Sequence, residues 1–146
     1  MDDLDERALR RLSDDGQRLT EGRRRVLQAL VDAGAPVTIP DILGLQPGLA
    51  QSSVYRNLAV LERAGLVSRI AMGDDHAHYE LAEDITDHHH HHLVCEACGK
   101  VSDVTLPDST ERALDRALDE AASVEGFALS RHRLDLIGRC RDCVSV

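Results

Sequence analysis

Two Cys-x-x-Cys pairs constrain the fold of this chain more than any other feature. Cys95 and Cys98 form the first pair, and Cys140 and Cys143 follow 42 residues later. Each pair places two thiols on one tight turn, and two pairs together complete a tetrahedral shell of four thiolates that suits Zn²⁺. A redox dithiol or disulfides could use the same residues, but a redox Cys-x-x-Cys normally stands alone in a thioredoxin-like unit. The spacing therefore predicts a structural zinc site.

A structural zinc site also fits the size of the chain. It has 146 residues, of which 42% are hydrophobic and 2% aromatic, enough for one modest domain or two small ones. Units below about 80 residues tend to need a metal or a disulfide. No apolar run in the sequence is long enough to span a membrane, and its start lacks the pattern of a signal peptide. We expect a cytoplasmic protein without a membrane partner, where cysteines favour metals over disulfides.

The N-terminal half has the pattern of a winged helix-turn-helix. Apolar residues at helical spacing follow two expected N-caps, Thr20 and Thr38, and Ser52 or Ser53 is expected to cap a third helix. Two short strands at 66–70 and 77–81 would form a hairpin around the turn at 72–75. Three helices and a hairpin wing are typical of this fold. A generic three-helix domain with an incidental hairpin is the alternative.

The second half predicts a smaller αβ unit. A strand is expected at 100–106, a helix from 107–109 onward with Leu114, Ala117, Leu118 and Ala121 on one face, and a long strand at 127–137. The overall class is therefore α+β. We expect a winged-helix DNA-binding domain at 1–81, a His-rich hinge at 82–92, and a dimerisation and metal-binding domain at 93–146.

The charge distribution is uneven along the chain. The net charge of −9 argues against a nucleic-acid partner when it is read for the whole chain. Between Arg18 and Arg69, however, seven arginines face four acids, a local charge of +3 that leaves −12 for the rest. Salt screens charges beyond about 8–10 Å, so DNA responds to the local charge. A DNA-reading unit inside an acidic chain is compatible with these numbers, as is a solvated charged face.

Five consecutive histidines, 88–92, precede the first cysteine pair. If the run is extended, His89 and His91 lie on one face and His90 and His92 on the other, so that one run can serve two metal sites. Each pair needs further ligands, and the candidates are Glu80, His76, His78, Glu111, Asp115 and His132. A solvated His-rich loop is the alternative. Hydrolase and phosphate-binding motifs are missing from the sequence, so we expect neither an enzyme nor a small-molecule substrate.

Three segments of the sequence resemble the ferric uptake regulator (Fur) family. They are residues 18–27, residues 52–67 and the string at 90–101 that joins the histidines to the first cysteine pair. The resemblance covers roughly residues 18–143. It implies a homodimeric, metal-responsive repressor with an N-terminal winged helix that reads double-stranded operator DNA and a C-terminal dimerisation domain.

The resemblance also implies roles for individual residues. Tyr55 and Arg56 match a DNA-contacting pair and Arg23 a phosphate-contacting arginine, and the expected DNA-binding set also includes Ser52, Ser53 and Asn57. The structural zinc ligands match Cys95, Cys98, Cys140 and Cys143. A hinge sensing site matches Glu80, His90 and His92, and a further site matches His89, His91, Asp115 and His132.

The sequence departs from this pattern near the second helix. Many relatives have a histidine ligand where this chain has Ala35 and Pro36, and His76 or His78 could fill the gap. A site of nitrogen and oxygen ligands suits several divalent metals. We expect Zn at the cysteines and Zn or Fe at the regulatory site, ahead of Mn or Ni. The alternatives are a peroxide-sensing regulator of the same family and a zinc-ribbon module that binds a protein partner.

Overall fold

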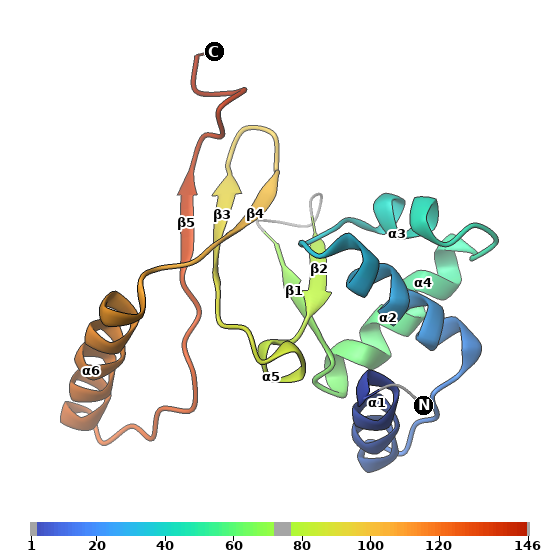
Figure 1. Ribbon diagram of the computed structural model, residues 1–146, viewed down its shortest axis with the longest axis horizontal. Helices are drawn as coiled ribbons and strands as arrows, with labels where there is room; N and C mark the ends of the chain where they lie inside the picture. The colour runs from blue at the N-terminus through green and yellow to red at the C-terminus, as the bar shows by residue number, and fades with distance from the viewer. Residues whose placement is uncertain (1–2, 72–76, 146) are drawn as a thin grey trace.

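The computed structural model describes residues 3–71 and 77–145. Its elements are α1 (Asp3–Asp14), α2 (Glu21–Ala33), α3 (Ile39–Leu45), α4 (Gln51–Arg63), β1 (Val67–Ile70), β2 (His78–Leu81), α5 (Glu83–Thr86), β3 (His91–Cys95), β4 (Val101–Val104), α6 (Asp108–Val124) and β5 (Asp135–Gly138). Figure 1 shows the helices α1–α4 on one side, the strands in the middle and α6 on the other side. The predicted α+β class is confirmed.

Local sequence signals account for the first helices. The Thr20 side chain accepts a hydrogen bond from the backbone N–H of Arg23 and begins α2, and Gly34 ends the helix in the left-handed region (φ 61°). Thr38 and Asp41 form a reciprocal capping box at the start of α3. Both predicted caps are therefore confirmed.

The start of α4 differs from the prediction. The helix begins at Gln51 after Ala50, without a side-chain cap, so Ser52 and Ser53 lie inside the first turn. The preceding helix ends only six residues earlier, at Leu45, and the short Pro47-Gly48 turn carries the chain directly into α4. The predicted serine cap is therefore absent.

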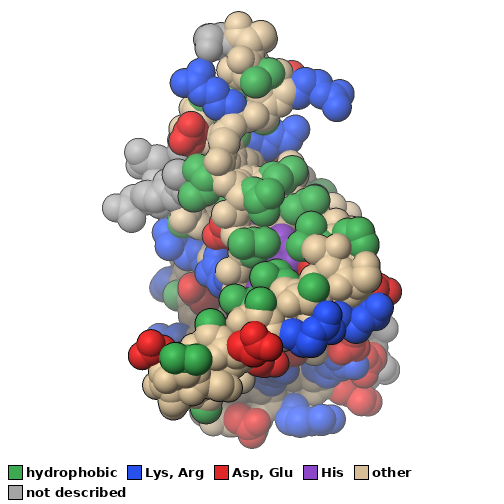
Figure 2. All heavy atoms as spheres, turned by 90° about the vertical axis from the view of Figure 1, so that its left-hand side faces the viewer, with side chains coloured by type: hydrophobic (Ala, Val, Ile, Leu, Met, Phe, Trp, Pro, Cys, Tyr) green, Lys and Arg blue, Asp and Glu red, His purple; other side chains and the backbone are tan. Residues whose placement is uncertain are grey.

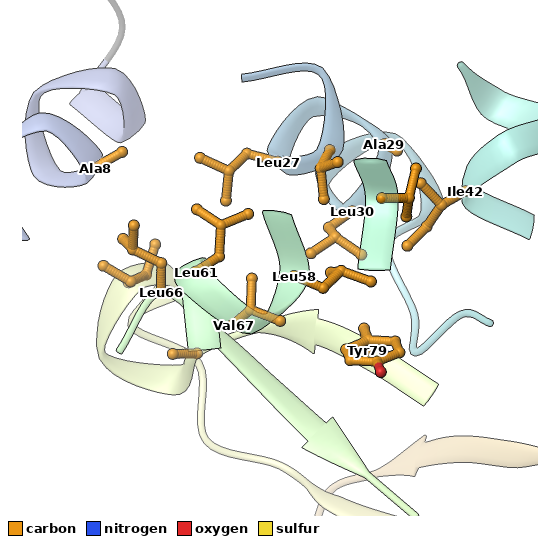
Figure 3. Close-up of a cluster of buried hydrophobic side chains, with 14 of the residues drawn as sticks. Ala8, Leu27, Ala29, Leu30, Ile42, Leu58, Leu61, Leu66, Val67 and Tyr79 are labelled. Atoms are coloured by element: carbon orange, nitrogen blue, oxygen red, sulfur yellow. The ribbon is translucent and has the colours of Figure 1, made fainter. Parts of the chain in front are cut away.

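One core holds the N-terminal elements together. Leu27, Ile42, Leu58, Leu61 and Leu66 are almost fully buried in it, and Figure 3 shows these side chains pointing toward one another from α2, α3, α4 and the start of the wing. Burying a leucine side chain contributes about 1.5–3 kcal/mol. The wing strands β1 and β2 pair antiparallel, and the predicted turn at 72–75, like most of the link between them, lies outside the described residues. The winged helix-turn-helix is confirmed.

The C-terminal elements form a three-stranded sheet with the order β4-β3-β5. Strands β3 and β4 pair antiparallel, whereas β3 and β5 pair parallel. The predicted long strand at 127–137 is too long, because only Asp135–Gly138 form β5. A parallel partner requires a crossover, so residues 127–134 carry the chain back from the end of α6 to the start of the sheet.

Helix α6 begins where the sequence predicted a helix with apolar residues on one face. No residue of this fully described helix is buried. The helix lies at the edge of the molecule, on the side away from α1–α4 (Figure 1). Within the described residues, none of the helices is sufficiently long and apolar to cross a membrane.

Candidate metal centres and DNA-reading surface

The four cysteines meet at one end of the sheet. Their Sγ atoms lie within 4.8 Å of one another, and those of Cys98 and Cys140 are 3.7 Å apart. The backbone N–H groups of Cys140 and Cys98 donate to Cys95 Sγ and lower the pKa of this thiol to about 6. Hydrogen bonding to Cys140 raises the pKa of Cys143 to about 12. Four adjacent thiolates repel one another, and a bound dication stabilises all four in the ionised form. Zn²⁺ fits this donor set.

A second cluster lies between the wing and the sheet. Glu80 of β2, His90 and His92 before and in β3, and Asp103 of β4 place their donor atoms within 4.8 Å of one another. Glu80 Oε2 is 2.9 Å from His90 Nε2, and Glu80 Oε1 is 2.6 Å from His92 Nε2. We call these four residues the hinge cluster.

The electrostatics of the hinge cluster favour an ionised Glu80. Burial opposes ionisation of this carboxyl, but the hydrogen bonds from His92 and His90 outweigh burial and hold its pKa below the ordinary value. The hydrogen bond to Glu80 in turn raises the pKa of His92, against the effect of burial. Asp103 stands 3.5 Å from His90 Nε2 and 3.7 Å from His92 Nε2, and its burial raises its pKa. Two carboxylates and two imidazoles around one point fit a divalent cation.

Asp103 was not among the predicted ligands, although the sequence contains a signal for it. The first Cys-x-x-Cys pair forms the connection between β3 and β4, and the antiparallel register places His92 opposite Asp103. If the first cysteine pair had been taken as the turn of a hairpin, the sequence would have predicted Asp103 as the residue opposite His92. His78 is buried in β2 but is not among the four donor residues of the hinge cluster, and His76 lies outside the described residues.

A third cluster lies on the α6 side of the sheet. It comprises His89, His91, Glu111 and His132, whose donor atoms also lie within 4.8 Å of one another; we call it the α6 cluster. Glu111 contacts His91 Nε2 and lies 3.3 Å from His89 Nε2. Glu111 Oε2 and His132 Nε2 are buried without a hydrogen-bond partner among the described residues. Buried donor atoms without a hydrogen bond suit the binding of a cation.

Of the two predicted candidate acids of α6, the α6 cluster includes Glu111 and not Asp115. Asp115 was expected in this site, but its Oδ1 lies 3.7 Å from His132 Nδ1 and the carboxylate among the imidazoles is that of Glu111. Glu111 lies one helical turn earlier on the same face of α6 and has the longer side chain. The predicted alternation of the histidine run is present, because His89 and His91 join this cluster whereas His90 and His92 join the hinge cluster.

The predicted DNA-binding residues do not all lie in the same environment. Tyr55 is 54% exposed on α4, and Ser52 and Arg56 are exposed beside it, whereas Ser53 is half-buried. Asn57 packs against α2, since a Cβ at Gly22 would lie 3.0 Å from Asn57 Nδ2. The Arg23 guanidinium, half-buried on α2, donates to the carbonyl of Arg18. The exposed face of α4 is therefore centred on Ser52, Tyr55 and Arg56.

A carboxylate outside the hinge cluster orients one of its histidines. Asp135 of β5 lies opposite His92 in the parallel register, and its Oδ1 is 3.2 Å from His92 Nδ1. A proton held on Nδ1 leaves Nε2 free to face Glu80 and a cation.

Asp135→Ala is expected to weaken divalent cation binding at the hinge cluster by about 10-fold, because His92 loses the partner that fixes its tautomer. Asp135→Asn retains an oxygen acceptor and should retain most of the affinity. Competition against a chelator measures both. The exposed Asp119 of α6 supplies the control Asp119→Ala, and equal affinities of Asp135→Ala and this control would contradict the orienting role.

Comparison with known proteins agrees with this arrangement. The model of the ferric uptake regulator family matches residues 14–137. The peroxide operon regulator of Bacillus subtilis (strain 168) is 36% identical over 140 residues, which cover 93% of this chain and 90% of that protein. The peroxide-responsive repressor PerR of Staphylococcus saprophyticus is 29% identical over 136 residues, covering 90% of this chain and 86% of the repressor.

Solved structures show the same fold. The ferric uptake regulator of Vibrio cholerae has a TM-score of 0.68 and 28% identity, covering 90% of this chain and 98% of that one. The ferric uptake regulator of Helicobacter pylori has a TM-score of 0.72 over 96% of this chain and 91% of that one, at 23% identity. The family match spans the winged helix, the hinge and most of the sheet together. The chain belongs to the ferric uptake regulator family, a family of metal-responsive, DNA-binding transcription regulators.

Proposed function

We propose that this chain acts as a homodimeric repressor whose affinity for operator DNA is controlled by a divalent cation in the hinge cluster. The observation that supports this function best is the position of Glu80. Its carboxylate belongs to the wing of the DNA-reading domain, yet it contacts His90 just before β3 and His92 in β3, the central strand of the C-terminal sheet. A ligand set shared between two domains links cation binding to their relative orientation.

A cation in the hinge cluster would supply the positive charge that holds two carboxylates, Glu80 and Asp103, close together. Apolar residues near the hinge cluster also hold the wing against the C-terminal sheet. Ile70 at the end of β1 is 1% exposed and packs in one cluster with Val94 of β3 and Val101 of β4. This apolar contact, like the Glu80 carboxylate, joins the wing to the sheet. Both contacts would be lost together if the domains separated.

The surface of α6 and β5 supports a dimer. Strand β5 lies at the edge of the sheet, and Phe127, Leu136 and Ile137 are 65%, 44% and 58% exposed. Figure 2, which views this side, shows hydrophobic side chains gathered in the middle of the face. Large exposed apolar patches mark protein interfaces, and an edge strand offers unpaired backbone groups to a second copy. We therefore assign this face to the homodimer interface.

In a dimer the two α4 helices would act as a pair. Two reading helices enter successive major grooves only when their separation matches about one helical turn of DNA or a multiple of it. We expect the exposed Tyr55 and Arg56 to contact bases, and Arg23 and Ser52 to contact phosphates. The hinge cluster would set the separation by fixing each reading domain against the dimer.

The donor sets support different metals at the different sites. Four thiolates favour Zn²⁺ as a permanent structural ion at the cysteines. The hinge cluster has nitrogen and oxygen donors only, and we assign it to Fe²⁺ or Zn²⁺, with Mn²⁺ and Ni²⁺ as the competing ions.

A titration of operator binding tests this function. Protein that retains only the cysteine-bound metal is mixed with operator DNA selected from random duplexes, and Fe²⁺, Zn²⁺, Mn²⁺ or Ni²⁺ is added in turn. We expect one of these ions to raise the operator affinity by about 5- to 150-fold, the usual range for coupled sites. Sequence-specific binding that does not respond to any ion would contradict the regulatory role. A lack of specific DNA binding would favour a protein-interaction module.

A second candidate function is peroxide sensing, favoured by the identity of 36% to the peroxide operon regulator of Bacillus subtilis. If the hinge cluster holds Fe²⁺, hydrogen peroxide is expected to add one oxygen atom to His90 or His92 with release of water, and operator affinity should fall as the ligand is lost. Mass spectrometry would detect the added oxygen atom on one of these histidines. Protein loaded with Zn²⁺ is the control and should stay unmodified. Loss of operator binding without histidine oxidation would contradict this mechanism.

A further inference from the structure

We propose that Glu83 of α5 couples the α6 cluster to the DNA-reading domain, so that a cation in this second cluster also controls operator affinity. This inference rests on the proposed function, since it requires operator binding to depend on the relative orientation of the two domains. It concerns a different site, a different carboxylate and a different connection from those of the hinge cluster.

The short helix α5 is attached to the DNA-reading domain. Ile85 is 7% exposed and belongs to the N-terminal core, as does Ala82 immediately before the helix. The backbone N–H of Ala82 donates to the carbonyl of Leu66 over 3.0 Å. Any force on α5 is therefore transmitted to the core that supports α4.

Two arginines of α1 strengthen this attachment. Arg11 donates to the carbonyl of Gly65 at 2.7 Å and pairs with Asp84 of α5 at 2.6 Å. It therefore bridges α5 and the turn after α4. Arg7 donates to the carbonyl of Ile85 at 3.1 Å. Helix α1 lies beside the turn below α4 in Figure 1, with α5 next to it. Helix α5 thus has a fixed position relative to α4.

Glu83 extends from α5 to the histidine run and so to the α6 cluster. Its Oε2 lies 3.0 Å from His89 Nδ1, whereas His89 Nε2 faces Glu111 of α6 at 3.3 Å. If the proton of the neutral imidazole is on Nδ1 and is donated to Glu83, Nε2 remains as the lone-pair donor for a cation. Glu83 is therefore a positioning residue, because it acts on the cluster through His89.

The α6 cluster has the chemistry for a cation. It combines three imidazoles with one carboxylate, and the orphaned Glu111 Oε2 and His132 Nε2 lie within it. A cation held there would fix the ring of His89, and the fixed ring would hold Glu83 and α5. The path from the cluster to α4 then runs through His89, Glu83, α5 and the arginines of α1.

The full-length protein with a saturated hinge cluster is used to test this coupling. Zn²⁺ binding at the α6 cluster is followed by chelator competition, and operator affinity is measured before and after the cluster fills. We expect filling to raise the wild-type operator affinity by about 5-fold or more. Glu83→Ala should lose this increase even at saturating Zn²⁺ and should bind the second ion about 10-fold more weakly. Glu83→Gln retains an oxygen acceptor for Nδ1–H and should restore part of both effects.

Two further variants make the test specific. His132→Ala removes a donor of the α6 cluster, and adding Glu83→Ala to it should cause no further loss of operator affinity if Glu83 acts through this cluster. The exposed Glu120 of α6 provides the control Glu120→Ala, which should behave like the wild type. Wild-type operator affinity that stays constant while the second ion binds, or full coupling in Glu83→Ala, would overturn the proposal.

Failure of the proposed function would look different. In that case the first ion, bound at the hinge cluster, would not change operator affinity in the wild type. An intact response to the first ion in Glu83→Ala shows that this variant is folded and that only the second connection is lost.

Discussion

Replacing His90 and His92 together by alanine is expected to abolish the dependence of operator binding on metal. The wild type should gain about 5- to 150-fold in operator affinity on loading, whereas the double variant should change by less than about 2-fold. The physical reason is that the variant leaves only Glu80 and Asp103, two carboxylates on separate domains, around the cation position. Fluorescence anisotropy of labelled operator DNA, with and without the ion, measures the difference.

The histidine run itself supplies the matched control for this double variant. His88 is exposed and belongs to neither cluster of the described residues, so His88→Ala should retain the wild-type response. The double variant should also retain its cysteine-bound zinc and its far-ultraviolet circular dichroism. A normal rise in operator affinity on metal loading in the double variant would exclude the hinge cluster as the regulatory site.

Cys95→Ser is expected to unfold the C-terminal sheet and to abolish the dimer. Cys95 accepts two backbone hydrogen bonds, from Cys98 and Cys140, at the point where the two cysteine pairs meet. The sheet buries few apolar side chains, with Val94 and Val101 as the main ones. Binding of a structural zinc ion contributes about 10–16 kcal/mol to the folding of small units of this kind, which is more than a small sheet can lose.

The N-terminal domain should survive this change, because its core does not depend on the cysteines. Sedimentation should report a monomer, elemental analysis a loss of about one zinc per chain, and circular dichroism a remaining helical transition. The exposed Val144, next to the second pair, gives the control Val144→Ala, for which a zinc-loaded dimer is expected. A stable, dimeric Cys95→Ser protein would show that zinc does not hold the sheet together.

The cysteine and histidine predictions illustrate which features a sequence can determine. The two thiol pairs, the caps Thr20 and Thr38 and the alternation of the histidine run depend on spacing within a few residues. Local geometry alone dictates them, since successive side chains of a strand point to opposite faces and a cap lies next to its helix. For this reason they could be predicted without knowing how the domains pack.

The remaining ligands depend on how distant elements pack against one another. Whether Glu111 or Asp115 reaches the imidazoles is decided by the position of α6 along the sheet, and Asp103 depends on the register of β4. Asp135 contacts His92 only because β5 pairs parallel with β3. These contacts join residues up to 43 positions apart, and spacing along the chain contains too little information about them.

The sequence by itself thus determined most of the N-terminal elements and the metal chemistry. It contained two thiol pairs, an alternating histidine run and a reading helix, each defined by short-range periodicity. Only the tertiary structure decided that Glu80 and Glu83 of the N-terminal part contact different histidines of the same run. The physical reason is that a link between domains depends on their packing, through the core that holds α5 and the contact of Ile70 with the sheet.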